Sequence, residues 1–258
     1  MINFLCVGGD KYGCNSFTKG SNGKIVSVDE ALNSDPSIPL CWAGSHKETL
    51  YYHCLEKKRN FFNLDTGYFG NTKRKEFIRV SLNNFQNCNP ITQRPSDRWA
   101  NLNISSITSL SRGSSIVVVP PDLKLCKSWK LGSEDDWIDS TIQEIKKYTD
   151  RPIRVRHRPT SRHQRLLDDT FINFLSDNTW CVVGWRSNAL TESVIADIPV
   201  IALGHSATKS LYPQTLSDIE SINSVSLELK QSWLNHLSYC QFTREELESG
   251  LAWKLLTT

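Results

Sequence analysis

The chain has 258 residues, of which 39% are hydrophobic and 22% are charged. This composition is that of a globular protein and excludes a disordered chain, and the length suffices for one large domain or two of ordinary size. The 30 Lys and Arg residues exceed the 27 Asp and Glu residues by a formal net charge of +3, an excess too small to indicate nucleic-acid binding.

The eight cysteines and the apolar segments indicate the cellular compartment of the protein. No two cysteines form a C-x-x-C pair, and none stands with histidines at the spacing of zinc ligands. No segment approaches the ~20 apolar residues of a membrane span, and the opening M-I-N-F-L-C-V-G-G-D lacks the regions of a signal peptide. We therefore expect a cytoplasmic protein with reduced thiols, no membrane span and no bound metal.

The first half of the chain alternates irregularly between strand and helix patterns. Short apolar runs predict strands over residues 3–7, 25–28, 40–43, 61–64 and 77–81. Helical spacing predicts a helix over residues 47–59. Residues 83–112 show no sustained periodicity, so we predict the domain junction there, with domains of residues 1–109 and 110–258.

The second half alternates regularly between strands and helices. Strands are predicted over residues 115–119, 153–157, 180–183 and 199–203. Helices are predicted after the N-cap Ser133, which has Asp136 three residues on, and over residues 166–175 and 189–196. The last thirty residues predict two amphipathic helices, which could cross back onto the first domain. The predicted fold class is α/β, with two Rossmann-like doubly wound domains facing a cleft.

The segment W-C-V-V-G-W-R-S-N-A-L-T-E-S-V-I-A-D-I-P-V-I-A-L-G carries the strongest functional pattern. A strand ends at Gly184, a polar turn brings Ser187 and Asn188 to the start of a helix, and a second strand ends before Gly204. Free N–H groups at such a helix start bind phosphate oxygens, and ligands of open parallel sheets lie at this edge. Glu192, one turn into the helix, is a candidate acceptor for a ribose diol. A generic Rossmann-like domain explains the same strands and cap.

Basic residues concentrate in R-P-I-R-V-R-H-R-P-T-S-R-H-Q-R, residues 151–165. In a strand Arg154, Arg156 and Arg158 share one face. Arg156 and Arg158 lie nearest to the carboxyl end, so we expect them to reach a diphosphate. For the other arginines of this run we expect a solvated strand end.

These motifs resemble the donor-binding half of GT-B-fold glycosyltransferases, including capsule-type and phage members. The matching residues are Ser187, Asn188, Glu192 and Pro199-Val200-Ile201. Asp197-Ile198 displaces the glycine that usually precedes the proline, and V-R-H-R-P at residues 155–159 is similar to an H-P signature with Arg158 inserted. The resemblance covers residues 115–203 and implies a GT-B-like fold with the donor on the second domain and the acceptor on the first.

The same resemblance implies transfer of a sugar, hexosyl or pentosyl, from a nucleotide sugar to a hydroxyl group. The nucleotide sugar is then a co-substrate, with no other cofactor. The chain contains no D-x-D motif, so we expect a metal-independent reaction. A non-catalytic nucleotide- or nucleic-acid-binding protein that keeps the fold is the alternative.

The stretch N-F-F-N-L-D-T-G-Y-F-G holds the candidate base of the first domain. Asp65 follows an apolar strand and precedes Gly67 and Gly70. An inverting transfer needs a carboxylate or a histidine to take the acceptor proton. An Asx-turn, in which Asp65 caps its own loop, explains the same pattern. His53 and Asp10 are the next candidates for the base.

Basic and aromatic residues flank this candidate base. The basic runs are Lys57-Lys58-Arg59 and Lys73-Arg74-Lys75, and the aromatic residues are Phe61, Phe62, Tyr68 and Phe69. Such a surface would suit a polyanion, for example DNA that carries a hydroxylated base. A solvated surface explains the same charges, so DNA is the minority interpretation, and a glycan or lipid-linked acceptor stays open.

Overall fold

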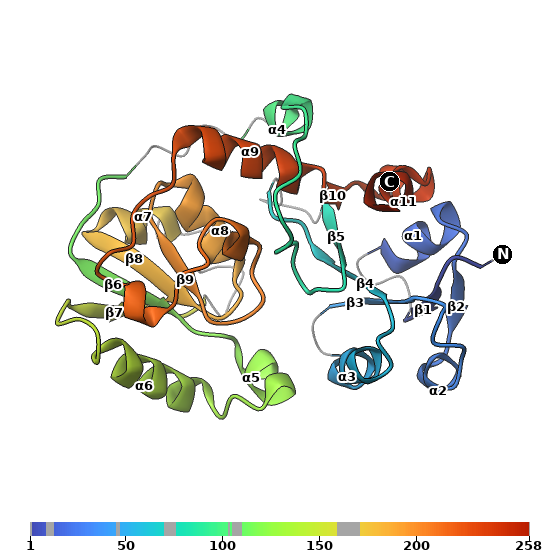
Figure 1. Cartoon of the computed structure of the whole chain (residues 1–258), viewed down its shortest axis with the longest axis horizontal. Coiled ribbons are helices and arrows are strands. Elements are labelled where there is room, and N and C mark those ends of the chain that lie inside the picture. The colour runs from blue at the N-terminus through green and yellow to red at the C-terminus, as the bar shows by residue number, and fades with distance from the viewer. Residues whose placement is uncertain are drawn as a thin grey trace. The chain divides into compact units, whose positions relative to one another are not determined.

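The computed structural model describes residues 2–8, 13–44, 47–69, 76–102, 104, 110–158 and 171–257. The chain divides into two compact units (Figure 1). Unit 1 comprises Met1–Asn87, Thr92–Ile104 and Leu234–Thr258, and unit 2 comprises Cys88–Ile91 and Ser105–Trp233. The end of the chain, which the predicted ranges assign to the second domain, therefore packs within unit 1. This agrees with C-terminal helices that cross back.

Unit 1 is built on a six-stranded sheet with the strand order β10-β5-β4-β3-β1-β2. Its strands are β1 (Leu5–Val7), β2 (Lys24–Val26), β3 (Leu40–Ala43), β4 (Phe61–Thr66), β5 (Ile78–Leu82) and β10 (Gln241–Phe242). The first four strands are parallel to one another, whereas β5 is antiparallel to β4 and β10 is antiparallel to β5. The five strands predicted in the first half are confirmed, and the sheet gains an antiparallel edge that the sequence pattern does not indicate.

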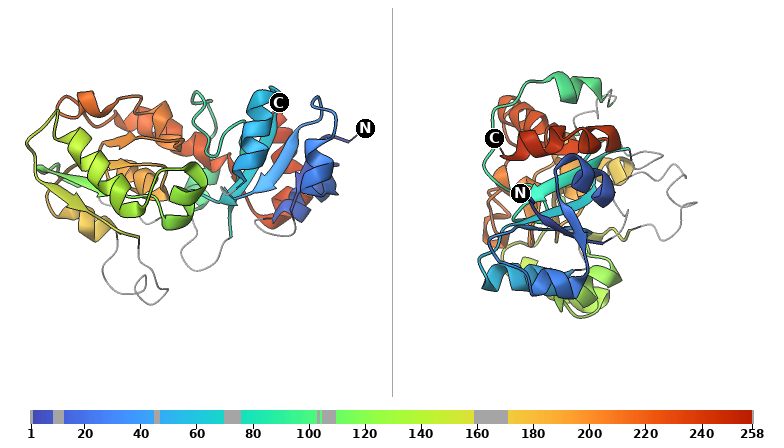
Figure 2. Two further views of the ribbon diagram at one scale, coloured as in Figure 1. Left: turned by 90° about the horizontal axis from the view of Figure 1, so that it is seen from below. Right: turned by 90° about the vertical axis from the view of Figure 1, so that its right-hand side faces the viewer.

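The helices of unit 1 are α1 (Cys14–Gly20), α2 (Val28–Leu32), α3 (Glu48–Glu56), α4 (Asp97–Asn101), α10 (Arg244–Glu248) and α11 (Leu251–Thr257). The C-terminal helices lie against α1 in both views of Figure 2. The approach is close, because a Cβ atom at Gly20 would lie 2.0 Å from the carbonyl oxygen of Leu247. The Ser16 hydroxyl also donates to Glu248 Oε1 at 2.9 Å. These contacts attach the end of the chain to its beginning.

Aromatic side chains fill both faces of this sheet. Phe62 packs against Trp253 of α11 with a ring separation of 5.4 Å. Phe61 stacks on Trp42 at 4.7 Å. Because neighbouring residues of a strand point to opposite faces, β4 is covered on both sides and its two phenylalanines are core residues.

Unit 2 is built on a four-stranded parallel sheet with the order β7-β6-β8-β9. Its strands are β6 (Ser115–Val119), β7 (Ile153–Val155), β8 (Thr179–Gly184) and β9 (Val200–Ala202). Its helices are α5 (Leu123–Trp129), α6 (Glu134–Ile145), α7 (Phe171–Ser176), α8 (Asn188–Ile195) and the first part of α9 (Leu227–Ser238), with the 3-10 helices η2 (Ala207–Ser210) and η3 (Leu216–Asp218). α5 and α6 cover one face of the sheet, and α7 and α8 cover the other (Figure 1).

Most local patterns of the second half are confirmed in unit 2, although residues 166–170 of the helix predicted over 166–175 lie outside the described residues. Strands alternate with helices, and Ser133 forms a capping box with Asp136 at the start of α6. β6 is buried along its whole length, as expected for a strand covered on both faces. The α/β fold class is therefore correct, with the antiparallel edge confined to unit 1.

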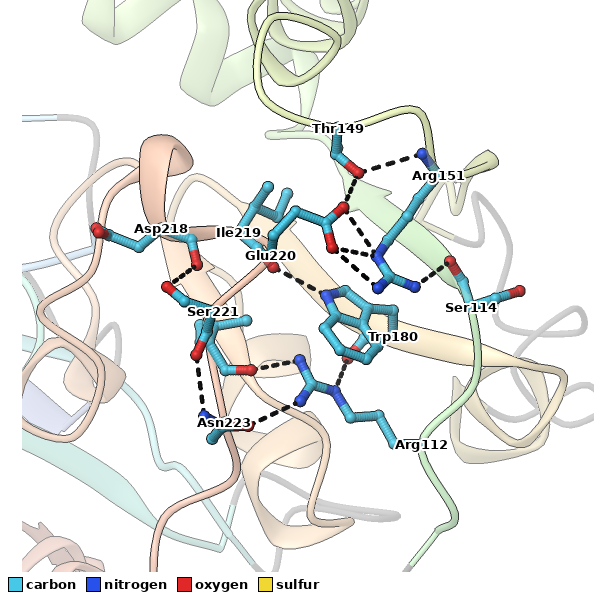
Figure 3. A network of polar contacts seen from close by, with 11 residues as sticks. Arg112, Ser114, Thr149, Arg151, Trp180, Asp218, Ile219, Glu220, Ser221 and Asn223 are labelled. Carbon is cyan, nitrogen blue, oxygen red and sulfur yellow. Dashed lines mark hydrogen bonds and ion pairs between the residues drawn. The ribbon is translucent and has the colours of Figure 1, made fainter.

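The amino edge of the unit 2 sheet is closed by a network around Trp180 (Figure 3). Its indole lies between two guanidinium groups, with Arg112 Cζ 3.2 Å and Arg151 Cζ 3.5 Å from the ring centroid. The indole N–H donates to the carbonyl oxygen of Ile219 at 2.9 Å. Arg151 forms an ion pair with Glu220 at 2.9 Å. The network holds the segment after η3 against the sheet.

The longest helices that the structure describes are α6 and α9, with 12 residues each. A helix needs ~20 apolar residues to cross a bilayer. Within the described residues, no helix is long and apolar enough to do so.

Candidate functional site

The carboxyl edge of the unit 2 sheet has the strand-turn-helix arrangement that the sequence predicts. β8 ends at Gly184, which is in register with Ala202 of the parallel strand β9. The turn after β8 leads into α8, and the Ser187 hydroxyl caps this helix by accepting from the backbone N–H of Ala189 at 3.2 Å. Ser187 and Asn188 therefore stand at a helix N-terminus on the edge where parallel sheets bind ligands.

Glu192 is the most unusual side chain of this edge. It lies four residues after Asn188 and so on the same side of α8. Its side chain keeps partial exposure, yet burial raises the pKa of its carboxyl group to about 7. No hydrogen bond or ion pair joins this carboxyl group to a residue that the structure describes. A carboxyl group with this environment is typical of a binding or catalytic site.

The turn after β8 contributes a second unsatisfied polar group. The indole N–H of Trp185 is buried and has no hydrogen-bond acceptor among the described residues. Its ring packs on Gly204, where a Cβ atom would lie 2.8 Å from the ring carbons. Glycine is therefore required after β9 for this approach. The edge presents an unpaired donor, the Trp185 N–H, and an unpaired acceptor, the Glu192 carboxyl group, among the described residues.

The structure also identifies a buried cation that the sequence analysis missed. Arg186 is 9% exposed, and its guanidinium carbon lies 5.0 Å from the centroid of the Trp129 ring. The Trp129 ring is in turn 6.0 Å from the ring of His205, which follows β9. Burial first, then the charges of Arg186 and Lys209, lower the pKa of His205. The longer basic run at residues 151–165 draws attention away from this single arginine, although its place directly before Ser187 is a usable signal.

Arg156 and Arg158 lie at the same edge but have other contacts. β7 ends at Val155, so the predicted alternation of one strand face does not extend to these two residues, which is a correction. The Arg156 guanidinium carbon lies 5.2 Å from the centroid of the Phe174 ring. Arg158 Nη1 donates to Asp122 Oδ2 at 3.1 Å. The Arg158 side chain is 65% exposed, so the guanidinium can exchange this partner for another anion.

Asp65, the candidate base of the first half, lies within β4 and not in a loop after it. Its Oδ1 accepts from the backbone N–H of the next residue, Thr66, at 2.8 Å, which is not the Asx-turn to the second residue on that the sequence suggests. Its Oδ2 accepts from Arg79 Nη2 at 3.0 Å, across the antiparallel pair of β4 and β5. The Asp65 side chain is 20% exposed and that of Arg79 8%. These contacts already give the carboxylate a structural role within unit 1.

The basic and aromatic stretch around Asp65 is not a stacking surface, which is a second correction. All four of its aromatic residues are buried, with at most 5% exposure: Phe61, Phe62, Tyr68 and Phe69. Arg59 is also buried, and its Nη1 donates to the carbonyl oxygen of Ala31 at 2.9 Å. Lys73-Arg74-Lys75 lie outside the described residues. Periodicity could not reveal this, because a strand covered on both faces does not alternate in polarity.

Of the other candidate bases, His53 lies on α3 and Asp10 lies outside the described residues. The Nε2 atom of His53 is buried without a hydrogen-bond partner in the described residues, and burial lowers the pKa of its imidazole. Neither observation connects His53 to a ligand.

The chain is similar to a known protein in fold and not in sequence. No protein-family model matches the chain, and no curated protein matches it in sequence. A solved structure does match: the KpsC protein of Thermosulfurimonas dismutans, described as a beta Kdo 2,7 transferase, is 12% identical, and the match covers 99% of each chain with a TM-score of 0.51. At this identity the likeness shows the fold alone, an α/β fold that extends over both units.

Proposed function

We propose that the chain is a glycosyltransferase that binds a nucleotide sugar at the carboxyl edge of the unit 2 sheet and transfers the sugar to a hydroxyl group. The observation that carries this proposal is the unpaired, partly buried carboxyl group of Glu192 behind the capped start of α8. A carboxylate accepts hydrogen bonds from a diol, and the N–H groups of the helix start bind phosphate oxygens. The likeness in fold to a sugar transferase supports the same assignment.

In this proposal each residue of the edge has a distinct task. Ser187 and Asn188 bind the phosphate nearest the helix, and Glu192 binds the ribose hydroxyls. Arg156 and Arg158 neutralise the diphosphate, for which Arg158 leaves Asp122. We add Arg186 to this set, because a buried guanidinium that lies over the Trp129 ring is a strong anion ligand.

The base that takes the acceptor proton is proposed to be Asp65, and this part rests on its position near the carboxyl end of β4. To act as a base, Asp65 would have to exchange its bond with Arg79 for the acceptor hydroxyl. We infer that the acceptor is a glycan rather than DNA with a hydroxylated base, because the aromatic side chains that would stack bases lie in the core.

The test is a thermal-shift panel of nucleotides and nucleotide sugars, followed by an assay for donor hydrolysis and transfer. A specific ligand at 100 times its Kd should stabilise the chain by about 2.7 kcal/mol. Glu192→Ala should weaken that ligand by about 1.5–3 kcal/mol, the cost of a charged hydrogen bond. Glu228→Ala is the matched control, because Glu228 is an exposed glutamate in the first turn of α9.

The outcomes separate enzyme from binding protein. Binding with hydrolysis or transfer supports the proposal, and activity that survives EDTA supports a metal-independent reaction. Binding of nucleotides without turnover of any sugar donor would favour the non-catalytic alternative. If no nucleotide stabilises the chain, or if Glu192→Ala and Glu228→Ala weaken nucleotide binding equally, the donor site does not lie at this edge.

A further inference from the structure

Three cysteine side chains meet in the core of unit 1. They are Cys6 of β1, Cys14 at the start of α1 and Cys41 of β3. Their sulfur atoms all lie within 4.8 Å of one another, and each residue is 0% exposed. None of the eight cysteines, all of which lie in the described residues, forms a disulfide.

The fold brings these residues together, although they are far apart in the sequence. β1 and β3 are neighbouring parallel strands, and Cys6 is in register with Cys41. Residues in register on neighbouring strands point to the same face of a sheet. α1 covers that face, and its first residue is Cys14. This explains why the spacing of the cysteines in the sequence gives no sign of a metal site.

A further polar group, the hydroxyl of Thr18, lies beside the cluster and interacts with Cys6. Thr18 lies four residues after Cys14 and therefore on the same side of α1. Its side chain is 8% exposed, and its hydroxyl has no nitrogen or oxygen partner among the described residues. A buried hydroxyl in this position is available to a thiolate or to an ion held by thiolates.

We infer that Cys6, Cys14 and Cys41 form a binding site for one monovalent copper ion. Soft thiolate ligands select Cu(I), whereas structural zinc takes four ligands. Within the described residues, this cluster offers three metal-ligating side chains, all of them cysteines. A metal–sulfur bond of about 2.3 Å places the sulfurs of a trigonal site about 4.0 Å apart. The observed cluster needs only a small contraction to reach that spacing.

Binding of the copper ion exchanges protons for the metal and involves no electron transfer. Each thiol that becomes a ligand loses its proton to solvent, copper–sulfur bonds form, and the metal remains monovalent. The ion reaches the buried sulfurs by local opening of unit 1, so uptake should be slow compared with binding at an exposed site. The site is independent of sugar transfer, and its failure would leave the proposed donor site untouched.

The test uses the full-length reduced protein under anaerobic conditions, with Cu(I) supplied as its complex with a coloured chelator. The wild type should withdraw one copper ion per chain. Cys14→Ala should lower the affinity by more than about 100-fold, beyond what loss of an outer-shell partner costs. Cys181→Ala is the matched control, because Cys181 is an equally buried cysteine of a parallel strand in unit 2. Circular dichroism verifies that each variant is folded, and Cys6→Ala replaces Cys14→Ala if the latter does not fold.

X-ray absorption at the copper edge and a parallel titration with zinc complete the experiment. A shell of three sulfur atoms at one copper per chain supports the inference. If folded wild-type protein takes no copper, or if the Cys14 and Cys181 variants bind equally, the cluster serves core packing only. If zinc binds the same cysteines more tightly than copper, the assignment to a monovalent ion is wrong.

Discussion

The polar groups around Trp180 at the amino edge of the unit 2 sheet are paired, whereas some at its carboxyl edge have no partner in the described residues. At the amino edge, Arg151 pairs with Glu220, and Trp180 lies between two guanidinium groups with its N–H bonded to Ile219 (Figure 3). At the carboxyl edge, the carboxyl group of Glu192 has no partner in the described residues. Buried polar groups are normally paired, so an unpaired one indicates a role other than stability. Paired groups at one edge hold the fold, and we propose that the unpaired groups at the other bind a ligand.

Asp65 tests this comparison, because its carboxylate is a paired group for which we nevertheless propose a catalytic role. It lies near a carboxyl edge, yet its carboxylate is paired with Arg79. If Asp65 is the base, Asp65→Asn should lower turnover by roughly 10²–10⁴ and leave donor binding unchanged. The amide keeps an oxygen for the Thr66 N–H, so this hydrogen bond survives the substitution. Single-turnover kinetics with a saturating donor measure the effect.

A fully active Asp65→Asn enzyme would strengthen the comparison and contradict the proposed role. The carboxylate would then serve only to hold Arg79 across β4 and β5, and a lower free energy of unfolding would be the visible effect. The search for the base would move to His53 and Asp10.

Trp180→Ala tests the amino edge. Removing a large aromatic side chain from a packed network should lower the free energy of unfolding by about 3–5 kcal/mol, measured in urea. Trp180→Phe keeps a ring between Arg112 and Arg151 but loses the bond to Ile219, so its cost should be about 0.5–1.5 kcal/mol. The folded fraction of either variant should bind nucleotide normally. A large change in nucleotide affinity would show that the two edges are coupled.

Glu192→Gln tests the carboxyl edge by the sign of its effect on stability. The pKa of this carboxyl group is raised from 4.5 to about 7 by burial, so its ionisation above pH 7 costs free energy in the folded chain. The wild type therefore loses stability between about pH 4.5 and pH 7, whereas the glutamine variant does not titrate. Since one pKa unit corresponds to about 1.36 kcal/mol, the variant should be more stable by on the order of 3 kcal/mol at pH 8 and equal at low pH.

The same substitution should weaken nucleotide binding most at pH 8, where the wild-type carboxylate is charged and accepts its strongest hydrogen bonds. Urea unfolding at pH 4.5 and pH 8, with nucleotide affinity at both, measures the two effects. A variant that is less stable at pH 8 would mean that Glu192 holds the fold, and the contrast between the two edges would fail.

The sequence predicts local structure well where one element determines the pattern. Ser133 with Asp136 marks the start of α6, and the run to Gly184, Ser187 and Glu192 predicts a strand, a turn and a helix that the structure confirms. Local patterns do not predict contacts between distant elements. The approach of α1 to α10 depends on Gly20, and the cysteine cluster depends on the register of β1 and β3.

Two features that the sequence did not predict also depend on contacts between distant elements. Phe61 and Phe62 looked like an exposed aromatic surface because both faces of β4 are buried, so neither phenylalanine alternates with a polar residue. Arg186 was missed because its signal in the sequence, a place directly before Ser187, is weaker than the basic run at residues 151–165. Its contact with Trp129 comes from the folding of α5 against the end of β8, and no spacing in the chain encodes it.

Arg158→Ala should have the smallest effect, and it tests whether a paired group at the carboxyl edge can also bind the donor. The ion pair of Arg158 with Asp122 is exposed, so its loss should change the free energy of unfolding by at most about 1 kcal/mol. Asp122→Ala should cost more, about 0.5–2 kcal/mol, because Asp122 also caps α5 through its bond to the Leu125 N–H. If Arg158 leaves Asp122 for the diphosphate, the arginine variant should bind a nucleotide less tightly and the corresponding nucleoside equally well, since the nucleoside has no phosphate. The loss should shrink as salt is added, because an exposed guanidinium is screened. Equal affinities of wild type and variant for the nucleotide at low salt would remove Arg158 from the site and leave its ion pair as a surface contact.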